Sequence, residues 1–351
     1  MKAVVLNHGK ILVRDDVEEP KPGMGQALVQ VKACGICGSD LHFAKHGASM
    51  MALGKEMSGS MMGDAAGGPE LDLKSDIYMG HEFSAELLDF GPDTQSDIKP
   101  GALVTALPVL MGMDGIEPIV YSNKTKGGYG ERMLLTAPLL LEVPNGLSAE
   151  IAALTEPMAV GLHGVNKGNI QSGEGALVLG CGPVGLAVIA ALKVKGIGPI
   201  VAADFSPARR ELAVKMGAHE AVDPREESAW AAWGRAGNGR PPVVFEAIGV
   251  PGIINDIMKM APSGARVVVV GVCMENDTIN PFFGISKELN IQFALGYDPM
   301  EFAGSLKSLA EGEIDGAAIV TAEVGLDKVA WAFDALGNPE EHCKILVVPG
   351  R

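Results

Sequence analysis

The chain has 351 residues, of which 47% are hydrophobic and 20% charged, a composition that is typical of a globular protein and excludes an intrinsically disordered one. Its formal net charge of −15 disfavours nucleic acid and anionic membranes as partners, because both bind basic surfaces. The length suggests about two domains. No apolar run approaches the ~18–20 residues of a membrane-spanning helix, and the first residues read as a strand rather than a signal peptide, so we expect a cytoplasmic protein.

The first 45 residues alternate short β-like runs with turns rich in proline and glycine, and strands are predicted at 3–6 and 27–31. The second predicted strand is followed by Cys34-Gly-Ile-Cys37. On its own, this pair fits either a redox site or half of a zinc knuckle. The sequence has no second Cys-x-x-Cys to complete a four-cysteine zinc site, and its five scattered cysteines do not indicate a disulfide framework.

Residues 46–79 are rich in methionine, glycine and serine and show no clear period. We therefore expect a loop or lid there, with one short helix. Because methionine adapts to irregular shapes, the segment is predicted to line an apolar substrate pocket, and an ordinary surface insertion is the alternative. Short strands and turns return over 80–155, a region that opens on Gly80-His81-Glu82 and ends at Thr155-Glu156-Pro157.

From about residue 160 the pattern changes to strands alternating with helices. Apolar strands are predicted at 176–179, 200–203, 243–246 and 266–270, with helices over 186–194 and 208–216 between the first three. Such near-continuous apolar runs are typical of a parallel sheet covered on both faces, which predicts a doubly wound α/β unit. After about residue 295 a helix-rich segment and a last strand, 344–348, are predicted.

A glycine-rich motif, Gly180-Cys-Gly182-Pro183-Val184-Gly185, follows the first of these strands and opens a helix. In this context the glycines permit a tight turn, close approach of a pyrophosphate and helix–strand packing, while the helix N-terminus offers free N–H groups to phosphate. Asp204 ends the next strand, and its carboxylate favours NAD over NADP, because it binds a ribose hydroxyl and repels a 2′-phosphate. Arg209 follows closely and tempers this preference slightly.

In combination these motifs resemble the zinc-dependent medium-chain dehydrogenase/reductase family, which includes alcohol, polyol and butanediol dehydrogenases. The resemblance runs essentially end to end and extends to 128–132, 152–157 and 269–272. It implies a GroES-like, β-rich catalytic domain over 1–158, an NAD-binding Rossmann domain over 159–294, and a return to the catalytic domain over 295–351.

The resemblance also implies the roles of individual residues. Cys37 and His81 would be zinc ligands, and the third protein ligand is open between Glu82 and Glu156. Asp40 would orient His81. Ser39 would receive the substrate hydroxyl proton, with His42 as the outer relay group. The backbone around Gly271 and Val272 would bind the nicotinamide carboxamide. The roles implied in the metal site concern seven residues: Cys37, Ser39, Asp40, His42, His81, Glu82 and Glu156.

Many members of this family hold a second, structural zinc through four closely spaced cysteines. Here residues 82–155 contain no cysteine. We therefore expect one catalytic zinc per chain and no structural zinc. The expected activity is NAD-dependent hydride transfer between a secondary alcohol, diol or polyol and its carbonyl product. A zinc-free enoyl or quinone reductase of the same fold and a non-catalytic dinucleotide-binding protein are the alternatives. A small-molecule substrate and a homodimer or homotetramer are expected as partners.

Overall fold

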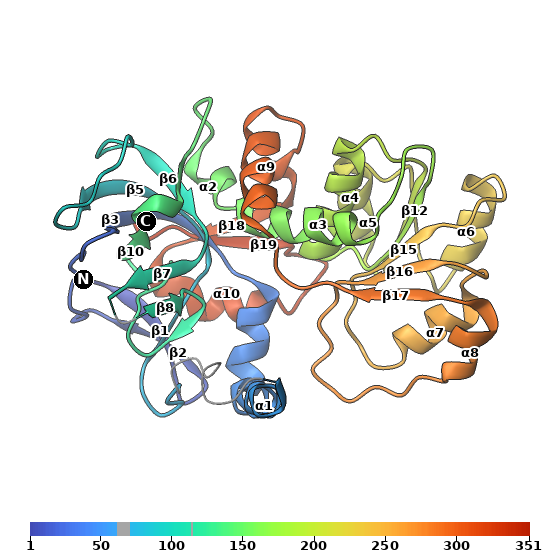
Figure 1. Cartoon of the computed structure of the whole chain (residues 1–351), viewed down its shortest axis with the longest axis horizontal. Helices are drawn as coiled ribbons and strands as arrows, with labels where there is room; N and C mark the ends of the chain where they lie inside the picture. Colours follow the sequence, from blue (N-terminus) through green and yellow to red (C-terminus); the bar gives the residue numbers. More distant parts are fainter. Residues whose placement is uncertain (62–70, 114) are drawn as a thin grey trace. The chain divides into compact units, whose positions relative to one another are not determined.

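The computed structural model describes residues 1–61, 71–113 and 115–351, and the chain divides into two compact units (Figure 1). The first unit contains 1–156, 322–337 and 344–351, and the second contains 157–321 and 338–343. Each unit has its own hydrophobic core. The chain leaves the first unit after Glu156, returns at Ala322, and belongs to the second unit once more over 338–343.

The first unit is β-rich. Its larger sheet has the strand order β11-β6-β5-β3-β19-β18, with β10 also paired to β3, and its smaller sheet has the order β2-β1-β4-β9, with β7 and β8 as a separate hairpin. The bounds of these strands are β1 (Ala3–Asn7), β2 (Lys10–Arg14), β3 (Gln26–Gly35), β4 (Ile77–Met79), β5 (Glu82–Phe90), β6 (Leu103–Ala106), β7 (Val109–Gly112), β8 (Gly115–Pro118), β9 (Tyr121–Ser122), β10 (Arg132–Thr136), β11 (Leu140–Glu142), β18 (Val320–Val324) and β19 (Lys344–Val347).

Strand β3 organises this unit, because it pairs antiparallel with β5, β10 and β19. Its residues alternate as the pleat requires, with Ala27, Val29, Val31 and Ala33 buried and the residues between them partly exposed. The strand ends at Gly35, two residues before Cys37, and β5 begins immediately after His81. The ends of two central strands therefore deliver the predicted metal-binding residues.

The prediction of a loop or lid with one short helix over 46–79 is wrong for its first part, because the helix there is long. Helix α1 (Gly38–Met61) runs through it, with a kink at His46, where φ is −129° and ψ is 20°. Methionine, alanine, leucine, lysine and glutamate favour a helix even where glycines break the apolar period. Phe43 is buried in the core of the first unit, and partly buried Met50 packs against that core. Residues 62–70 of the methionine-rich segment lie outside the described residues.

The second unit is the predicted doubly wound α/β structure. Its six-stranded sheet has the order β14-β13-β12-β15-β16-β17, and every pairing is parallel. Helices lie on both faces of the sheet, with α4 and α5 on one and α7 and α8 on the other (Figure 1). The strand bounds are β12 (Ala176–Leu179), β13 (Ile200–Ala203), β14 (Glu220–Val222), β15 (Val243–Glu246), β16 (Arg266–Val269) and β17 (Asn290–Phe293). The helix bounds are α3 (Thr155–Lys167), α4 (Pro183–Val194), α5 (Pro207–Met216), α6 (Ala229–Ala236), α7 (Ile253–Met260), α8 (Pro281–Lys287) and α9 (Pro299–Ala310).

The strand order of this sheet reverses between β12 and β15, since the chain first proceeds outward through β13 and β14 and then starts again on the other side. In open parallel sheets, ligands bind beyond the carboxyl ends of the strands at such a point. The remaining helices are α2 (Ala149–Ala152) and α10 (Val329–Ala335), with short 3₁₀ turns at 137–139, 316–319 and 326–328. No helix in the described ranges is both long enough and apolar enough to cross a membrane.

Candidate functional site

The glycine-rich turn lies between β12 and α4, at the point where the strand order reverses. Gly180 has a φ of +94°, and a Cβ there would lie 2.8 Å from the Ala247 carbonyl oxygen. A Cβ on Gly185 would lie only 1.9 Å from the Gly180 carbonyl oxygen. Gly182 caps α4, and Pro183 occupies the first helical position, where no N–H is needed. The turn thus brings backbone N–H groups and a helix N-terminus together, an arrangement that suits phosphate.

Asp204 directly follows β13 and is fixed beside this turn. Its Oδ2 accepts a hydrogen bond from the Cys181 N–H at 2.7 Å, and its Oδ1 accepts one from the Ser206 N–H at 2.9 Å. Arg209, on α5, is close by, since its Nη1 would be 4.0 Å from a Cβ on Gly182. Within the described residues, the buried Nε of Arg209 has no hydrogen-bond partner. One carboxylate and one cation therefore flank the turn.

A cavity of about 610 Å³ opens beside the turn and contains these groups. Its volume lies within the range of small-molecule and cofactor sites. The lining residues that bear on the argument are Gly180, Asp204, Phe205, Arg209, Trp230 and Ile248. Gly271 and Val272 follow β16 and do not line this cavity. They pack on the neighbouring loop instead, where a Cβ on Gly249 would lie 2.6 Å from the Val272 carbonyl oxygen.

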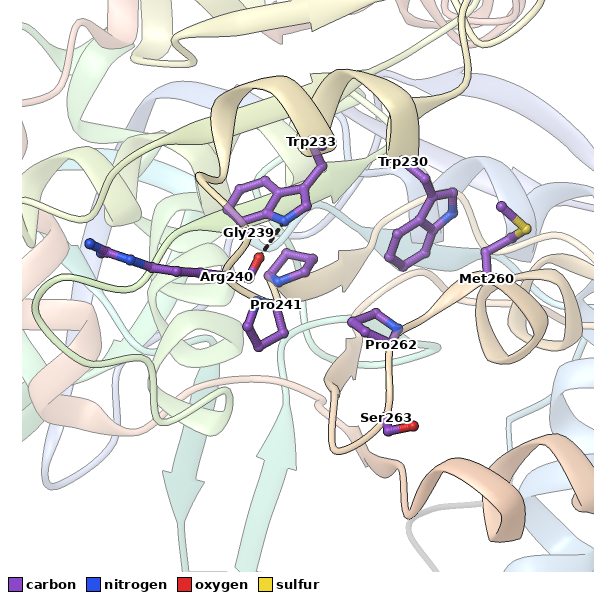
Figure 2. A pocket seen from close by; sticks show the side chains of 10 residues that line it. Trp230, Trp233, Gly239, Arg240, Pro241, Met260, Pro262 and Ser263 are labelled. Atoms are coloured by element: carbon purple, nitrogen blue, oxygen red, sulfur yellow. Dashed lines mark hydrogen bonds between the residues drawn. The ribbon is translucent and has the colours of Figure 1, made fainter.

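A second, more open hollow of about 420 Å³ lies next to α6 (Figure 2). It shares Trp230 and Met260 with the first cavity and is otherwise formed largely by Trp233 and by the rings of prolines 241, 242 and 262. The indole N–H of Trp233 is already engaged, because it donates to the Arg240 carbonyl oxygen at 2.8 Å. This hollow offers apolar rings and lacks the charged pair of the first cavity.

The first unit holds the second group of predicted residues. Cys37 lies between β3 and α1, and His81 lies between Gly80 and β5. Their side chains lie close enough for the charge of Cys37 to raise the pKa of His81. His81 is buried, and its Nδ1 lies 3.7 Å from Oδ1 of Asp40 without a hydrogen-bond partner among the described residues. Gly80 has a φ of +100°, and a Cβ there would lie 2.8 Å from the Tyr129 nitrogen. Only glycine allows the chain to bring His81 in so closely.

Asp40 is fully buried at the first turn of α1. Its Oδ2 accepts hydrogen bonds from the Tyr129 hydroxyl at 2.6 Å and from the Cys37 N–H at 3.2 Å. Burial raises the pKa of Asp40, and the charge of His81 opposes this. Burial in turn lowers the pKa of His81, but the charges of Asp40, Cys37 and Glu156 outweigh it, so the pKa of His81 is raised well above its usual range. The surroundings of His81 are therefore strongly anionic and favour a cation.

The two candidate carboxylates have different surroundings. Both oxygens of Glu82 accept hydrogen bonds from Lys344 Nζ at 2.7 Å, and Lys344 also donates to the Ile36 carbonyl oxygen at 3.0 Å. Each of these two side chains is only 1% exposed, so this is a fully buried ion pair. Glu156, in the first turn of α3, is also buried and contributes to the raised pKa of His81.

The donor types at this point suit zinc. In the part of the chain that the structure describes, no three His, Cys, Asp or Glu side chains already form a closed metal-binding group. The charges of Cys37 and Glu156 nevertheless raise the pKa of His81, and its buried Nδ1 has no hydrogen-bond partner among the described residues. Thiolate, imidazole and carboxylate together are an ordinary zinc ligand set, and metal binding itself commonly orders such ligands. The residues therefore fit zinc, with Glu82 committed to Lys344.

Ser39 is half-buried at the start of α1, and His42, three residues further, is exposed. Partial burial of its ring lowers the pKa of His42, and the charges of His46 and Lys45 lower it further. This imidazole is therefore neutral at pH 7. Sequence reasoning missed three residues that lie around the predicted metal-binding side chains: Tyr121, Tyr129 and Lys344. Lys344 had a detectable signal, because a lysine that opens an otherwise apolar strand needs a buried partner.

Two family models match the chain. Residues 23–145 match the alcohol dehydrogenase GroES-like domain, and residues 183–311 match the model described as zinc-binding dehydrogenase. The chain is 31% identical to (R,R)-butanediol dehydrogenase of Bacillus subtilis, with 99% of this chain and all of that protein covered. It is 27% identical to sorbitol dehydrogenase of Bacillus subtilis, with coverage of 100% and 98%.

Solved structures agree with these matches. A crystal structure of 2R,3R-butanediol dehydrogenase from Bacillus subtilis superimposes with a TM-score of 0.82 at 30% identity and covers 99% of both chains. A zinc-binding dehydrogenase from Sinorhizobium meliloti, described as bound to NADP, superimposes with a TM-score of 0.80 at 28% identity, again over 99% of both chains. The likeness therefore extends over both units.

Proposed function

Since this chain belongs to the zinc-dependent medium-chain dehydrogenase family and is an oxidoreductase acting on CH–OH groups, we propose that it oxidises a vicinal diol or polyol to the hydroxyketone with NAD as the hydride acceptor. The observation that carries the proposal is the proximity of Cys37 to buried His81, whose Nδ1 lies 3.7 Å from Oδ1 of buried Asp40. Relatives named for butanediol and sorbitol support the substrate class. The reverse reduction is catalysed by the same site.

The chain's own side chains account for the remaining chemistry. Bound zinc would supply a Lewis acid that lowers the pKa of the alcohol oxygen, and bound nicotinamide would accept the hydride from the carbinol carbon. Cys37 and His81 would hold the metal, and Asp40 fixes the orientation of the imidazole. Ser39 receives the hydroxyl proton, and exposed His42, which is neutral at pH 7, passes it to solvent.

Glu156 is the favoured third zinc ligand. The ammonium group of Lys344 occupies both oxygens of Glu82, whereas Glu156 is buried and its charge raises the pKa of His81. Removing Glu82 from Lys344 would leave a buried cation unpaired, which is costly.

We propose one zinc per chain. In place of a cysteine-bearing lobe, the β7–β8 hairpin is anchored by Thr136, whose hydroxyl accepts from the Met111 N–H at 2.9 Å and donates to the Val109 carbonyl oxygen at 2.8 Å.

The preference for NAD over NADP rests on Asp204. A carboxylate held by two backbone N–H groups cannot swing away from a 2′-phosphate, and its remaining lone pairs suit ribose hydroxyls. Arg209 would then serve the pyrophosphate. A comparison of kcat/KM for NAD and NADP tests this preference, and a value for NADP equal to or above that for NAD would overturn it.

We propose that the molecule is a homo-oligomer that pairs through β17. This strand is the outer strand of its sheet, and the large apolar side chains on and around it are exposed, with Phe293 64% and Leu295 87% accessible. Exposed apolar edge strands normally pair or are covered. An edge that pairs with its own copy gives a twofold dimer.

The five cysteines are all free, which supports a cytoplasmic location.

The proposed activity is tested by Cys37→Ala together with metal analysis. We expect the wild-type protein to contain about one zinc and to reduce NAD with diols, and the variant to lose both its zinc and more than about 100-fold of its turnover, because residues that only orient a ligand cost about 10–100-fold. Cys273→Ala is the matched control and should retain both properties, since Cys273 belongs to the second unit and Cys37 and His81 to the first. Full activity in the metal-free Cys37 variant would refute the mechanism.

A further inference from the structure

The proton path and metal ligands leave one polar group near the site unexplained. Tyr121, in the two-residue strand β9, has a buried hydroxyl that makes no hydrogen bond of ordinary geometry with any described group. Burial raises the pKa of Tyr121, the charge of Asp40 adds to this, and the nearby Ser39 hydroxyl partly offsets it. The phenol is therefore a neutral hydrogen-bond donor at every pH at which the protein is expected to work.

Two contacts determine where this hydroxyl lies. Tyr121 pairs with Met79 across β9 and β4, two residues before His81. Its ring stacks on Phe43 with the centroids 3.9 Å apart and the planes 11° from parallel. Phe43 is four residues after Ser39 on α1, so both side chains lie on the same face of the helix. The stack therefore holds the Tyr121 hydroxyl beside Ser39, where the substrate oxygen would lose its proton.

We infer that Tyr121 is a specificity-determining residue whose hydroxyl donates a hydrogen bond to the second oxygen of a vicinal diol or hydroxyketone. The inference rests on the proposed function, because it takes the first oxygen to lie at Ser39. An adjacent hydroxyl on the substrate is then the nearest group that can reach Tyr121. A monoalcohol places a methyl or methylene group there and leaves the buried phenol without a partner, which disfavours its binding.

The test is Tyr121→Phe, which keeps the stack on Phe43 and removes only the hydroxyl. The probes are 2,3-butanediol and 2-butanol, which differ by that second oxygen. We expect kcat/KM for the diol to fall about tenfold or more, mainly through KM, because a lost hydrogen bond leaves the diol no better held than the monoalcohol. The value for 2-butanol should stay unchanged or rise, and zinc content should not change.

Tyr78→Phe is the matched control. Tyr78 lies on β4, the partner strand of β9, and its ring is covered by Lys126 instead of Phe43. That variant should leave the ratio between the two alcohols unchanged. An equal loss on both alcohols in Tyr121→Phe would overturn the inference, because the tyrosine would then act through Ser39 or through the fold. An unchanged ratio would overturn it as well.

A binding measurement separates this inference from the proposed activity. Calorimetric affinities of the zinc-loaded protein for the two alcohols, measured with NADH present, require no turnover. The wild type should bind the diol about tenfold more tightly than 2-butanol, and Tyr121→Phe should remove that difference. Equal affinities in the wild type would overturn the inference. Absence of turnover with every alcohol would instead contradict the proposed function.

Discussion

At the scale of single residues, the buried ion pair of Glu82 and Lys344 is the physical basis on which we propose Glu156 and not Glu82 as the third zinc ligand. A carboxylate enclosed by the protein needs a partner for both oxygens, and the lysine supplies it while its third hydrogen bond goes to Ile36. The exposed pair of Lys307 and Glu311 on α9 has the same chemistry without the burial. The comparison between them separates the effect of burial from that of charge.

Lys344→Met should lower the free energy of unfolding by about 3–5 kcal/mol, because it leaves Glu82 as an unpaired buried charge. The double variant Glu82→Gln with Lys344→Met should regain much of that loss, since neither charge remains. Chemical denaturation of the single and double variants measures both effects. Lys307→Met should change stability by less than about 1 kcal/mol. A Lys344→Met protein as stable as the wild type would show that the pair does not matter for folding.

At the scale of elements, the turn before α4 contains two glycines with different physical demands. A Cβ on Gly185 collides with the Gly180 carbonyl at 1.9 Å, so the protein itself requires glycine there. Among the residues that the structure describes, the nearest atom to a Cβ on Gly182 would be Arg209 Nη1, at 4.0 Å. Packing against the described residues therefore does not require glycine at 182. A pyrophosphate that approaches the backbone closely would require it.

Two alanine substitutions test this distinction. Gly185→Ala should lower the thermal midpoint of the second unit with no cofactor present, because the helix must move away from the turn. Gly182→Ala should keep that midpoint and weaken NAD binding by about tenfold or more, given the loss of close hydrogen bonds to phosphate. Thermal unfolding and fluorescence titration with NADH provide the two readouts. Undiminished NAD affinity in Gly182→Ala would contradict the placement of the phosphate.

The sequence predicted those elements whose residues have one dominant environment. The strands at 176–179, 200–203 and 243–246 match the structure because central parallel strands are apolar throughout. Strand β17 was missed, since an edge strand with exposed residues reads as Asn-Ile-Gln-Phe without a clear pattern. The part of α1 after residue 45 was predicted as a loop or lid with one short helix, because glycine and serine interrupt its apolar period. The partner of Glu82 was out of reach, because Lys344 is 262 residues away in the chain.

At the scale of the whole molecule, the exposed edge at β17 carries the prediction of oligomerisation. The double variant Phe293→Asp with Leu295→Asp places two charges where a second copy would pair, and desolvating them opposes association. We expect the wild type to sediment as a dimer or a larger even-numbered oligomer and the variant as a monomer at micromolar concentration. Met113→Asp is the control, because Met113 is 95% exposed on the other unit. A wild-type monomer would refute the interface.

Strand β19 also sets the order in which the molecule can mature during synthesis. It pairs with β3 through Leu346 and Val347 and delivers Lys344 to Glu82, yet it leaves the ribosome after the whole second unit. Until then Glu82 has no counter-ion and β3 lacks one neighbour. The nascent chain can therefore complete its second unit while the first unit still lacks the strand that gives Glu82 its partner.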